Sequence, residues 1–79
     1  IHGLSVFPNP IDNQINIVQN SNKILEVYIF DVAGKLILDS HANYLFNTIN
    51  VSNLRSGIYF LQICTDGCEK SNFYKIVKK

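Results

Sequence analysis

The stretch NVSNLRSGIYFLQIC, residues 50–64, decides the fold of this chain of 79 residues. It begins with a polar corner and continues into the most continuous apolar run of the sequence. We expect Leu54 to pack under the corner and Gly57 to allow a backbone turn that a side chain would obstruct. Tyr59 should enter the core ring-first while its hydroxyl bonds back to the corner's backbone, the tyrosine-corner arrangement of β-sandwich domains. The segment therefore specifies a fold before it specifies a function.

The apolar run at residues 58–63 predicts a central strand. Ile, Tyr, Phe and Leu occupy both of its alternating faces, which is typical of a strand that is covered on two sides. The chain has nine aromatic residues, five Phe and four Tyr, and no Trp. In so small a domain we expect most of them in the core, so we predict no aromatic surface for stacking on sugars or bases.

Six further segments predict strands, because they are short, apolar or alternating, and separated by turn residues. They cover residues 3–7, 14–19, 24–32, 35–39, 46–51 and 69–79. The period of the 24–32 run would also fit a helix, but its β-branched and aromatic content and the turn at residues 31–35 favour a strand. Seven strands predict an all-β fold, a seven-stranded antiparallel β-sandwich of the immunoglobulin-like type. Residues 1–79 form a single domain, with residues 1–3 expected to be the remnant of a linker.

Two prolines flank Asn9 directly after the first predicted strand. Pro8 and Pro10 fix two φ angles, remove two backbone donors and restrict the residues before them to extended geometry. We expect a stiff, extended crossing from one sheet to the other, with the turn at residues 12–13.

Composition limits the class of protein. The chain is 47% apolar and 16% charged, the balance of a globular domain, and its length allows one small core. A formal net charge of +1 argues against a nucleic-acid-binding protein, which needs a broad basic face. No run approaches the ~20 apolar residues of a membrane-spanning helix. The start at Ile1 carries no secretory signal and suggests a piece of a longer polypeptide.

Cys64 and Cys68 enclose Thr65, Asp66 and Gly67, and Asp-Gly between two apolar runs is a strong hairpin signal. A three-residue loop with Gly67 in the left-handed conformation would place the two cysteines opposite each other, where a disulfide can form. A two-residue loop would point them to opposite faces. The sequence leaves both registers open. A zinc site is disfavoured, because structural zinc takes four protein ligands.

No constellation of residues predicts catalysis, a cofactor or a metal site. Four acids lie at or beside predicted turns, where local hydrogen bonding is common: Asp12, Asp31, Asp39 and Asp66. His2 and His41 are expected on the solvated surface. Phosphate-binding loops, nucleophile elbows and calcium loops have no counterpart in the sequence. Asn50-Val51-Ser52 matches a glycosylation acceptor, but we interpret Asn50 as a corner residue.

Four short motifs follow one another along the chain. They are FPNP at residues 7–10, VYIFD at 27–31 with GK at 34–35, VSNL at 51–54 with GIY at 57–59, and KIVK at 75–78. In this order and spacing they resemble the type A C-terminal sorting domain of the type 9 secretion system (Por secretion) of Bacteroidetes-type bacteria. The resemblance extends from Leu4 to Lys79.

The resemblance implies a non-catalytic address label, with no cofactor, at the C-terminus of a larger secreted cargo protein. Its implied partners are the outer-membrane translocon of the type 9 system and a sortase-like peptidase that usually removes the domain, with cleavage ahead of Leu4. The cargo would pass through the periplasm to the cell surface or the extracellular space, and would be released or linked to an anionic lipopolysaccharide. Nucleic-acid binding and membrane insertion are not implied.

The resemblance also assigns roles to residues. The fold motif comprises Pro8, Asn9, Pro10, Gly34, Leu54, Gly57 and Tyr59, and the candidate residues for recognition by the translocon are Lys75, Ile76, Val77, Lys78 and Lys79. We expect recognition by addition of this strand's edge to a partner sheet. The same lysines would also keep an edge strand from aggregating. Phe7 stands where the family often has Tyr, and the cysteine pair is not part of the family pattern.

The alternative function is an immunoglobulin-like accessory module that binds carbohydrate or protein for a neighbouring catalytic domain. The sequence lacks the Trp-containing platform that would support it.

Overall fold

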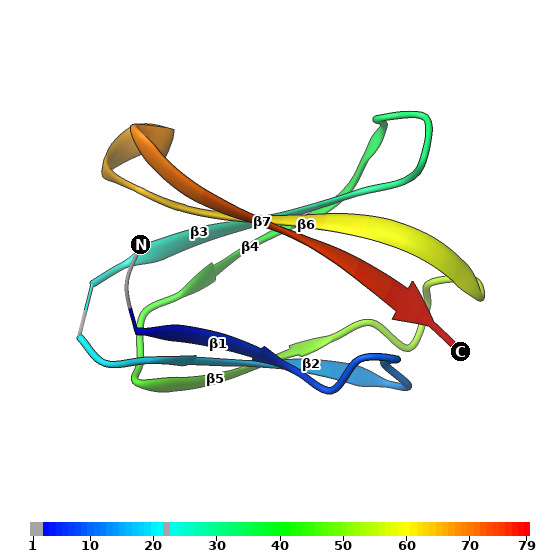
Figure 1. Ribbon diagram of the computed structural model, residues 1–79, viewed down its shortest axis with the longest axis horizontal. Helices are drawn as coiled ribbons and strands as arrows, with labels where there is room; N and C mark the ends of the chain where they lie inside the picture. The colour runs from blue at the N-terminus through cyan, green and yellow to red at the C-terminus, as the bar shows by residue number, and fades with distance from the viewer. Residues whose placement is uncertain (1–2, 22) are drawn as a thin grey trace.

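The computed structural model describes residues 3–21 and 23–79, which form seven strands in two packed antiparallel sheets (Figure 1). One sheet has the order β1-β2-β5, from β1 (Leu4–Phe7), β2 (Gln14–Gln19) and β5 (Phe46–Asn50). The other has the order β4-β3-β6-β7, from β3 (Leu25–Phe30), β4 (Leu36–Ala42), β6 (Gly57–Thr65) and β7 (Lys70–Lys78). The prediction of an immunoglobulin-like β-sandwich is confirmed. Within the described residues, no helix has the length and apolar character needed to cross a membrane.

The strand boundaries agree with the sequence prediction to within two residues at each end, except in β4. The prediction ended this strand at Asp39 and placed His41 and Ala42 in a loop, but both residues belong to β4. They pair with the first two residues of β3, His41 opposite Glu26 and Ala42 opposite Leu25. Ala42 is completely buried. Pairing and burial together extend the strand beyond what its local sequence indicates.

The segment after β1 does not cross to the other sheet, so that prediction was wrong. β1 and β2 are neighbours in one sheet, with Leu4 opposite Gln19 and Phe7 opposite Asn16. The Phe7–Pro8 and Asn9–Pro10 peptide bonds are both cis. The segment reverses the chain and, on the way, brings Ile11 beside Lys78 in a parallel bridge to the end of β7.

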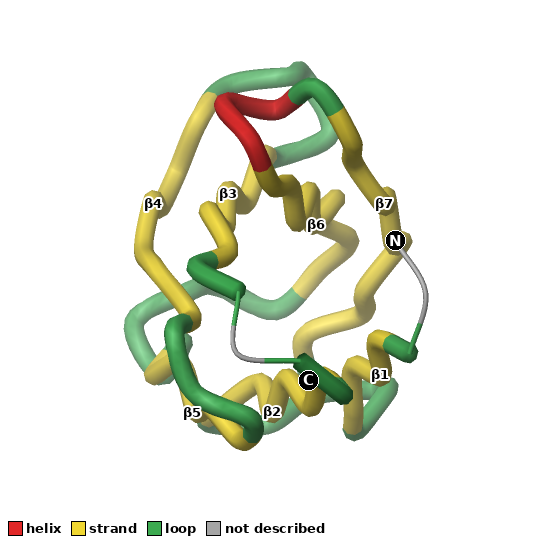
Figure 2. The backbone as a smooth tube through the Cα atoms, turned by 90° about the vertical axis from the view of Figure 1, so that its left-hand side faces the viewer, coloured by secondary structure: helices red, strands yellow, loops and turns green. Residues whose placement is uncertain are grey.

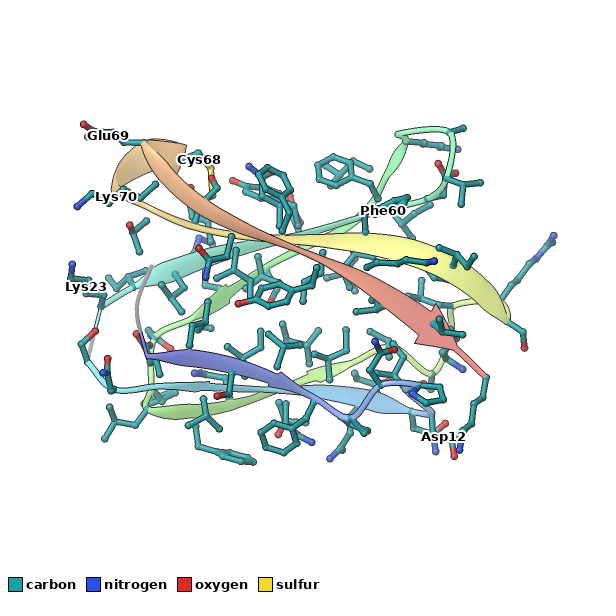
Figure 3. All side chains as sticks on the ribbon, viewed as in Figure 1. Asp12, Lys23, Phe60, Cys68, Glu69 and Lys70 are labelled. Atoms are coloured by element: carbon teal, nitrogen blue, oxygen red, sulfur yellow. A yellow bond between two sulfur atoms is a disulfide. The ribbon has the colours of Figure 1, made fainter. Side chains whose placement is uncertain are left out.

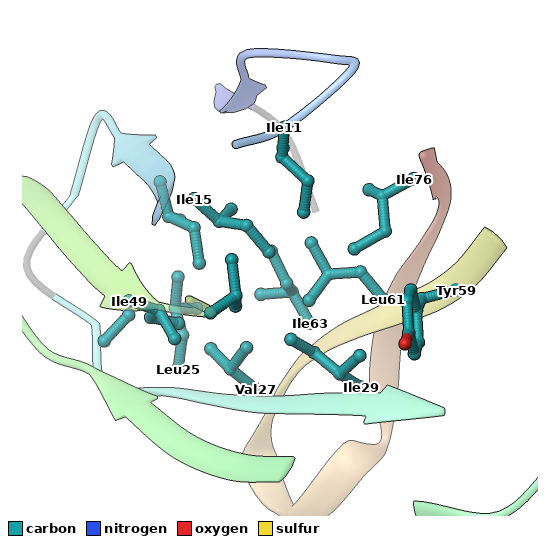
Figure 4. Close-up of a cluster of buried hydrophobic side chains, with 13 residues drawn as sticks. Ile11, Ile15, Leu25, Val27, Ile29, Ile49, Tyr59, Leu61, Ile63 and Ile76 are labelled. Atoms are coloured by element: carbon teal, nitrogen blue, oxygen red, sulfur yellow. The ribbon is translucent and has the colours of Figure 1, made fainter. Parts of the chain in front are cut away.

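The core between the sheets is aliphatic (Figure 4). Each strand contributes alternate residues, as the period of a strand requires. The side chains with less than 2% exposure include Ile11, Ile15, Ile17, Leu25, Val27, Ile29, Val51, Leu61, Ile63 and Ile76. Ile15 and Ile17 of β2 point inward, as the alternation of residues 14–19 predicts, and in β3 the structure places Leu25, Val27 and Ile29 inside.

Most aromatic residues lie outside this core, contrary to the prediction. Tyr59 alone of the nine is buried, at 9% exposure, whereas Phe7, Tyr44, Phe46, Phe60 and Phe73 are exposed. The prediction that β6 is covered on two sides was also wrong, since Ile58 and Phe60 are each 41% exposed. In a sandwich of two layers each sheet has one buried face. Aliphatic residues fill that face here, and most aromatic residues lie at the alternate strand positions, whose side chains point away from the core.

The tyrosine corner is formed as predicted. The Tyr59 hydroxyl donates to the Arg55 carbonyl oxygen at 2.8 Å. Gly57 has a φ of +149°, a conformation that side chains rarely allow. Leu54 packs against the core, and its amide donates to the Val51 carbonyl at 3.0 Å. These contacts fix the connection that leads from β5 in one sheet to β6 in the other.

We predict that Tyr59→Phe lowers the free energy of unfolding by about 1 kcal/mol, because it leaves the Arg55 carbonyl without its partner while retaining the ring. Urea denaturation of the purified domain measures the difference. Tyr44→Phe, at a tyrosine that is 68% exposed, is the matched control and should change stability by less than about 0.5 kcal/mol. Equal effects of the two substitutions would contradict the tyrosine corner as a stabilising contact.

Candidate functional site

The candidate recognition residues lie at the end of β7, an edge strand of the four-stranded sheet. β7 pairs with β6 along its whole length, from Lys70 opposite Thr65 to Lys78 opposite Gly57. In Figure 2, β4 and β7 flank the central β3–β6 pair, and β5, β2 and β1 lie together in the other layer. The outer edge of β7 is therefore turned away from the rest of its sheet.

The side chains at this end of the chain alternate between the two faces. Ile76 and Lys78 point inward, with 2% and 7% exposure, whereas Lys75, Val77 and Lys79 are exposed. The Lys78 ammonium donates to the Lys79 carbonyl oxygen at 3.3 Å, so its stem packs inside while its charge remains satisfied. Of this motif, the side chains at 75, 77 and 79 are exposed to solvent.

Asn9 and Ile11 cover the outer edge of β7, and we call these two residues and their hydrogen bonds the brace. The Asn9 side chain accepts from the Val77 amide at 3.0 Å and donates to the Lys75 carbonyl at 3.3 Å. The Ile11 amide donates to the Val77 carbonyl at 2.7 Å, and its carbonyl accepts from the Lys79 amide at 2.9 Å. Asn9 thus makes the two contacts that a neighbouring strand's backbone would make.

The brace occupies the edge at which the sequence analysis expected a partner strand to add. Addition at residues 75–79 requires backbone groups that are free, and these groups already bond to Asn9 and Ile11. In the folded domain this part of the edge is therefore occupied, and addition of a partner strand there would require the brace to be released. Sequence reasoning assigned Asn9 to the fold and missed Ile11. A large apolar residue directly after Pro-x-Pro was the available signal.

Cys64 and Cys68 form a disulfide, with their Cα atoms 4.7 Å apart. The predicted geometry was only partly right. Gly67 is left-handed, with a φ of +66°, but Cys64 lies opposite Ser71 and Cys68 belongs to a 3₁₀ turn at the hairpin tip. The disulfide therefore links β6 to the turn that follows it. The sequence prediction considered only cysteines that face each other across the hairpin, so it did not include this arrangement.

Glu26 brings a carboxylate to this disulfide from the neighbouring strand β3. Its Oε2 lies 3.4 Å from Cys68 Sγ and 3.7 Å from Cys64 Sγ. Cysteine binds metal as a thiolate, and neither sulfur carries that charge while the two are bonded. Partial burial and the carboxylates of Glu26 and Asp39 raise the pKa of the Tyr28 phenol above its ordinary value. This end of the sheet therefore contains a disulfide crosslink with the carboxylates of Glu26 and Asp39 on the same sheet.

Several of the remaining sequence assignments lie in turns, but Asp39, which was expected beside a turn, lies within β4, where it pairs with Tyr28. Asp31 closes the β3–β4 turn, where its Oδ1 accepts from the Ala33 and Lys35 amides at 2.9 Å each. Asn50 is a corner residue, since its Oδ1 accepts from the Ser52 amide at 2.9 Å and hydroxyl at 2.7 Å. His41 is exposed on β4. His2 lies outside the described residues.

Comparison with known proteins gives a matching family and solved structures with a similar fold. The description "Secretion system C-terminal sorting domain" matches residues 5–79. A solved structure of PorZ, an essential bacterial surface component of the type-IX secretion system of Porphyromonas gingivalis, has a similar fold, with a TM-score of 0.71 and 18% sequence identity. The similarity covers 98% of this chain and 11% of the PorZ chain. No curated protein matches the chain.

We predict that Asn9→Ala frees the edge of β7. The substitution removes two hydrogen bonds at an exposed position, where water replaces part of the loss, so the free energy of unfolding should fall by about 1 kcal/mol. Hydrogen exchange should show faster exchange at the Val77 amide. Asn9→Asp keeps the acceptor for that amide and should protect it better than Asn9→Ala does.

Asn53→Ala is the matched control, at an exposed asparagine whose side chain makes no hydrogen bond to the described residues. It should leave exchange at Val77 unchanged. Protection of the Val77 amide that does not depend on residue 9 would contradict the brace.

Reduction of the Cys64–Cys68 disulfide should lower the free energy of unfolding by about 2 kcal/mol, since the bond closes a short loop in the unfolded chain. Urea denaturation with and without a dithiol reductant measures this. The Cys64→Ser, Cys68→Ser double variant should match the reduced protein and be insensitive to reductant. A wild-type protein that is equally stable in both conditions would contradict the prediction.

Proposed function

Because the chain belongs to the family of secretion system C-terminal sorting domains, we propose that it directs a larger cargo protein through the type 9 secretion system. The observation that carries this proposal is the extent of the family match. Residues 5–79 include the whole of β2 to β7 and all but the first residue of β1. The complete sandwich is therefore the unit that the family shares. Sorting domains of this family act by binding, not by catalysis.

The outer-membrane translocon recognises the domain in its folded state. In an unfolded chain, all the side chains of residues 75–79 would be exposed alike. In the folded domain, pairing with β6 and the brace leaves only Lys75, Val77 and Lys79 of this segment exposed. The edge of β7 at these residues is occupied, so the exposed side chains, rather than backbone pairing, make the contact with the translocon. A rigid strand also costs less conformational entropy on binding than a disordered tail does.

The cargo precedes β1, and a sortase-like peptidase removes the domain ahead of Leu4. β1 starts at Leu4, and Gly3 contributes a carbonyl that accepts from the Asn20 amide at 3.1 Å. A cut ahead of these residues would leave the sandwich intact. The cargo then passes from the periplasm to the cell surface or the extracellular space.

We expect that a reporter protein followed by this domain is exported by a bacterium with a type 9 system, and that the reporter without the domain is retained. Immunoblots of cells and medium measure the distribution. The exported reporter should be smaller than the retained precursor by the 9.0 kDa of the domain, because the peptidase acts during or after export.

The same fusion in a strain without the translocon is the control and should remain inside the cell. Equal export of the reporter with and without residues 1–79 would contradict the proposed function. Export at full precursor mass would contradict removal of the domain while leaving its role as a signal in place.

A further inference from the structure

An exposed apolar strip crosses the outer face of the four-stranded sheet. We define the outer strip as Leu36, Phe30, Phe60, Ile58, Val77 and Phe73. Strand register makes it continuous, since Phe30 lies between Leu36 and Phe60 and Ile58 lies opposite Val77. Figure 3 shows Phe60 on the side of β6 that is turned away from the other sheet.

Five of the six side chains of the strip are exposed, and Phe30 is half-buried. The exposed fractions are 45% for Leu36, 41% for Phe60, 39% for Val77 and 68% for Phe73. The core does not need these side chains, because the inward positions of the same strands already fill it. The outer face of an antiparallel sheet can be polar, and a contiguous apolar area on a small protein commonly marks an interaction site.

A lysine lies at each end of the row Leu36–Phe30–Phe60, which runs across the sheet. Lys75 is opposite Phe60 and stands between Phe73 and Val77 on the same face of β7. Lys35 is exposed in the turn directly before β4, which begins with Leu36. Neither side chain has an ion-pair partner among the residues that the structure describes. The Asp31 carboxylate beside Lys35 is turned into the hairpin, where it accepts backbone hydrogen bonds.

We infer that the outer strip is the docking surface for a protein of the secretion apparatus, whose own contact surface is apolar with carboxylates on both sides. This inference rests on the proposed function and names the surface that carries it out. The strip spans three strand spacings, about 14 Å, so a strand pair or an amphipathic helix with acidic flanks fits across it. Apolar contact supplies affinity, and the two lysines set orientation.

The charges on the same face favour a protein over an anionic bilayer. Glu26 and Asp39 are also on this face, opposite Cys64 and Tyr28 respectively. A uniformly negative membrane surface would be repelled by these carboxylates, whereas a protein can place its acids only beside the lysines. A second copy of the domain would bring lysine-flanked strips together, which opposes stacking in the same direction.

The test uses the complete reporter fusion in the secreting host, with two variants of the strip. Phe60→Ser removes the central ring, and Lys75→Glu reverses one flanking charge without touching the brace, which uses only the backbone of that residue. Each should lower export by about tenfold or more. Thermal unfolding of the purified domain should stay close to wild type for Lys75→Glu, so a loss of export cannot come from misfolding.

The matched controls are Phe46→Ser and Lys70→Glu. Phe46 is 58% exposed on β5 of the other sheet, and Lys70 is exposed at the start of β7, outside the strip. Export of both should stay within about twofold of wild type. Strip variants that are exported like these controls would overturn the inference. Because deletion of the whole domain tests the proposed function separately, the two failures are distinguishable.

Two binding measurements test the class of partner. Wild-type domain should not sediment with phosphatidylglycerol vesicles, and it should be monomeric in analytical ultracentrifugation at micromolar concentration. Vesicle binding that Phe60→Ser and Lys75→Glu both abolish would replace the protein partner by a lipid surface. A dimer that Phe60→Ser dissociates would replace it by a second copy of the chain.

Discussion

The contact between the loop after β1 and the outer edge of β7 is the constraint on which the exposed surface at the end of β7 depends. Asn9 and Ile11 provide four hydrogen bonds to the backbone of residues 75–79. An edge strand otherwise leaves such groups open to pairing with other chains. Here the end of β7 is tied to a loop of the other sheet, and Figure 1 shows it descending toward that loop. The brace therefore holds the end of β7 in one register and protects it from unspecific pairing with other chains.

Because β7 is held in one register, the side chains of its basic end lie alternately on two distinct faces. Ile76 and Lys78 are committed to the interior, and Lys75 and Val77 join the side chains of β6 on the outer face. The lysines at the end of the chain are thus not interchangeable. Lys78 is a packed residue whose ammonium donates to the Lys79 carbonyl, and Lys75 carries an exposed charge opposite Phe60. The fold therefore gives the lysines of one short motif different surroundings.

The disulfide acts at the opposite end of β7 from the brace. It links β6 to the hairpin tip that leads into β7, and the carboxylate of Glu26 lies against both sulfurs. One covalent and one hydrogen-bonded constraint therefore hold the two ends of the same strand. Because β6 pairs along the whole of β7, the strand is also held in place between these two ends.

The sequence by itself determined the strands, the sandwich and the tyrosine corner, because period, turn residues and the Gly57–Tyr59 spacing are local properties of the chain. It also supported the family. Only the tertiary structure decided that Pro8 to Pro10 return the chain within one sheet, and that Ile11 reaches β7, since both depend on which strands become neighbours. Tertiary structure also placed Phe60 and Phe73 outside, although their hydrophobicity alone suggests burial. A two-layer sandwich has a single interior, and aliphatic residues at the alternate strand positions fill it.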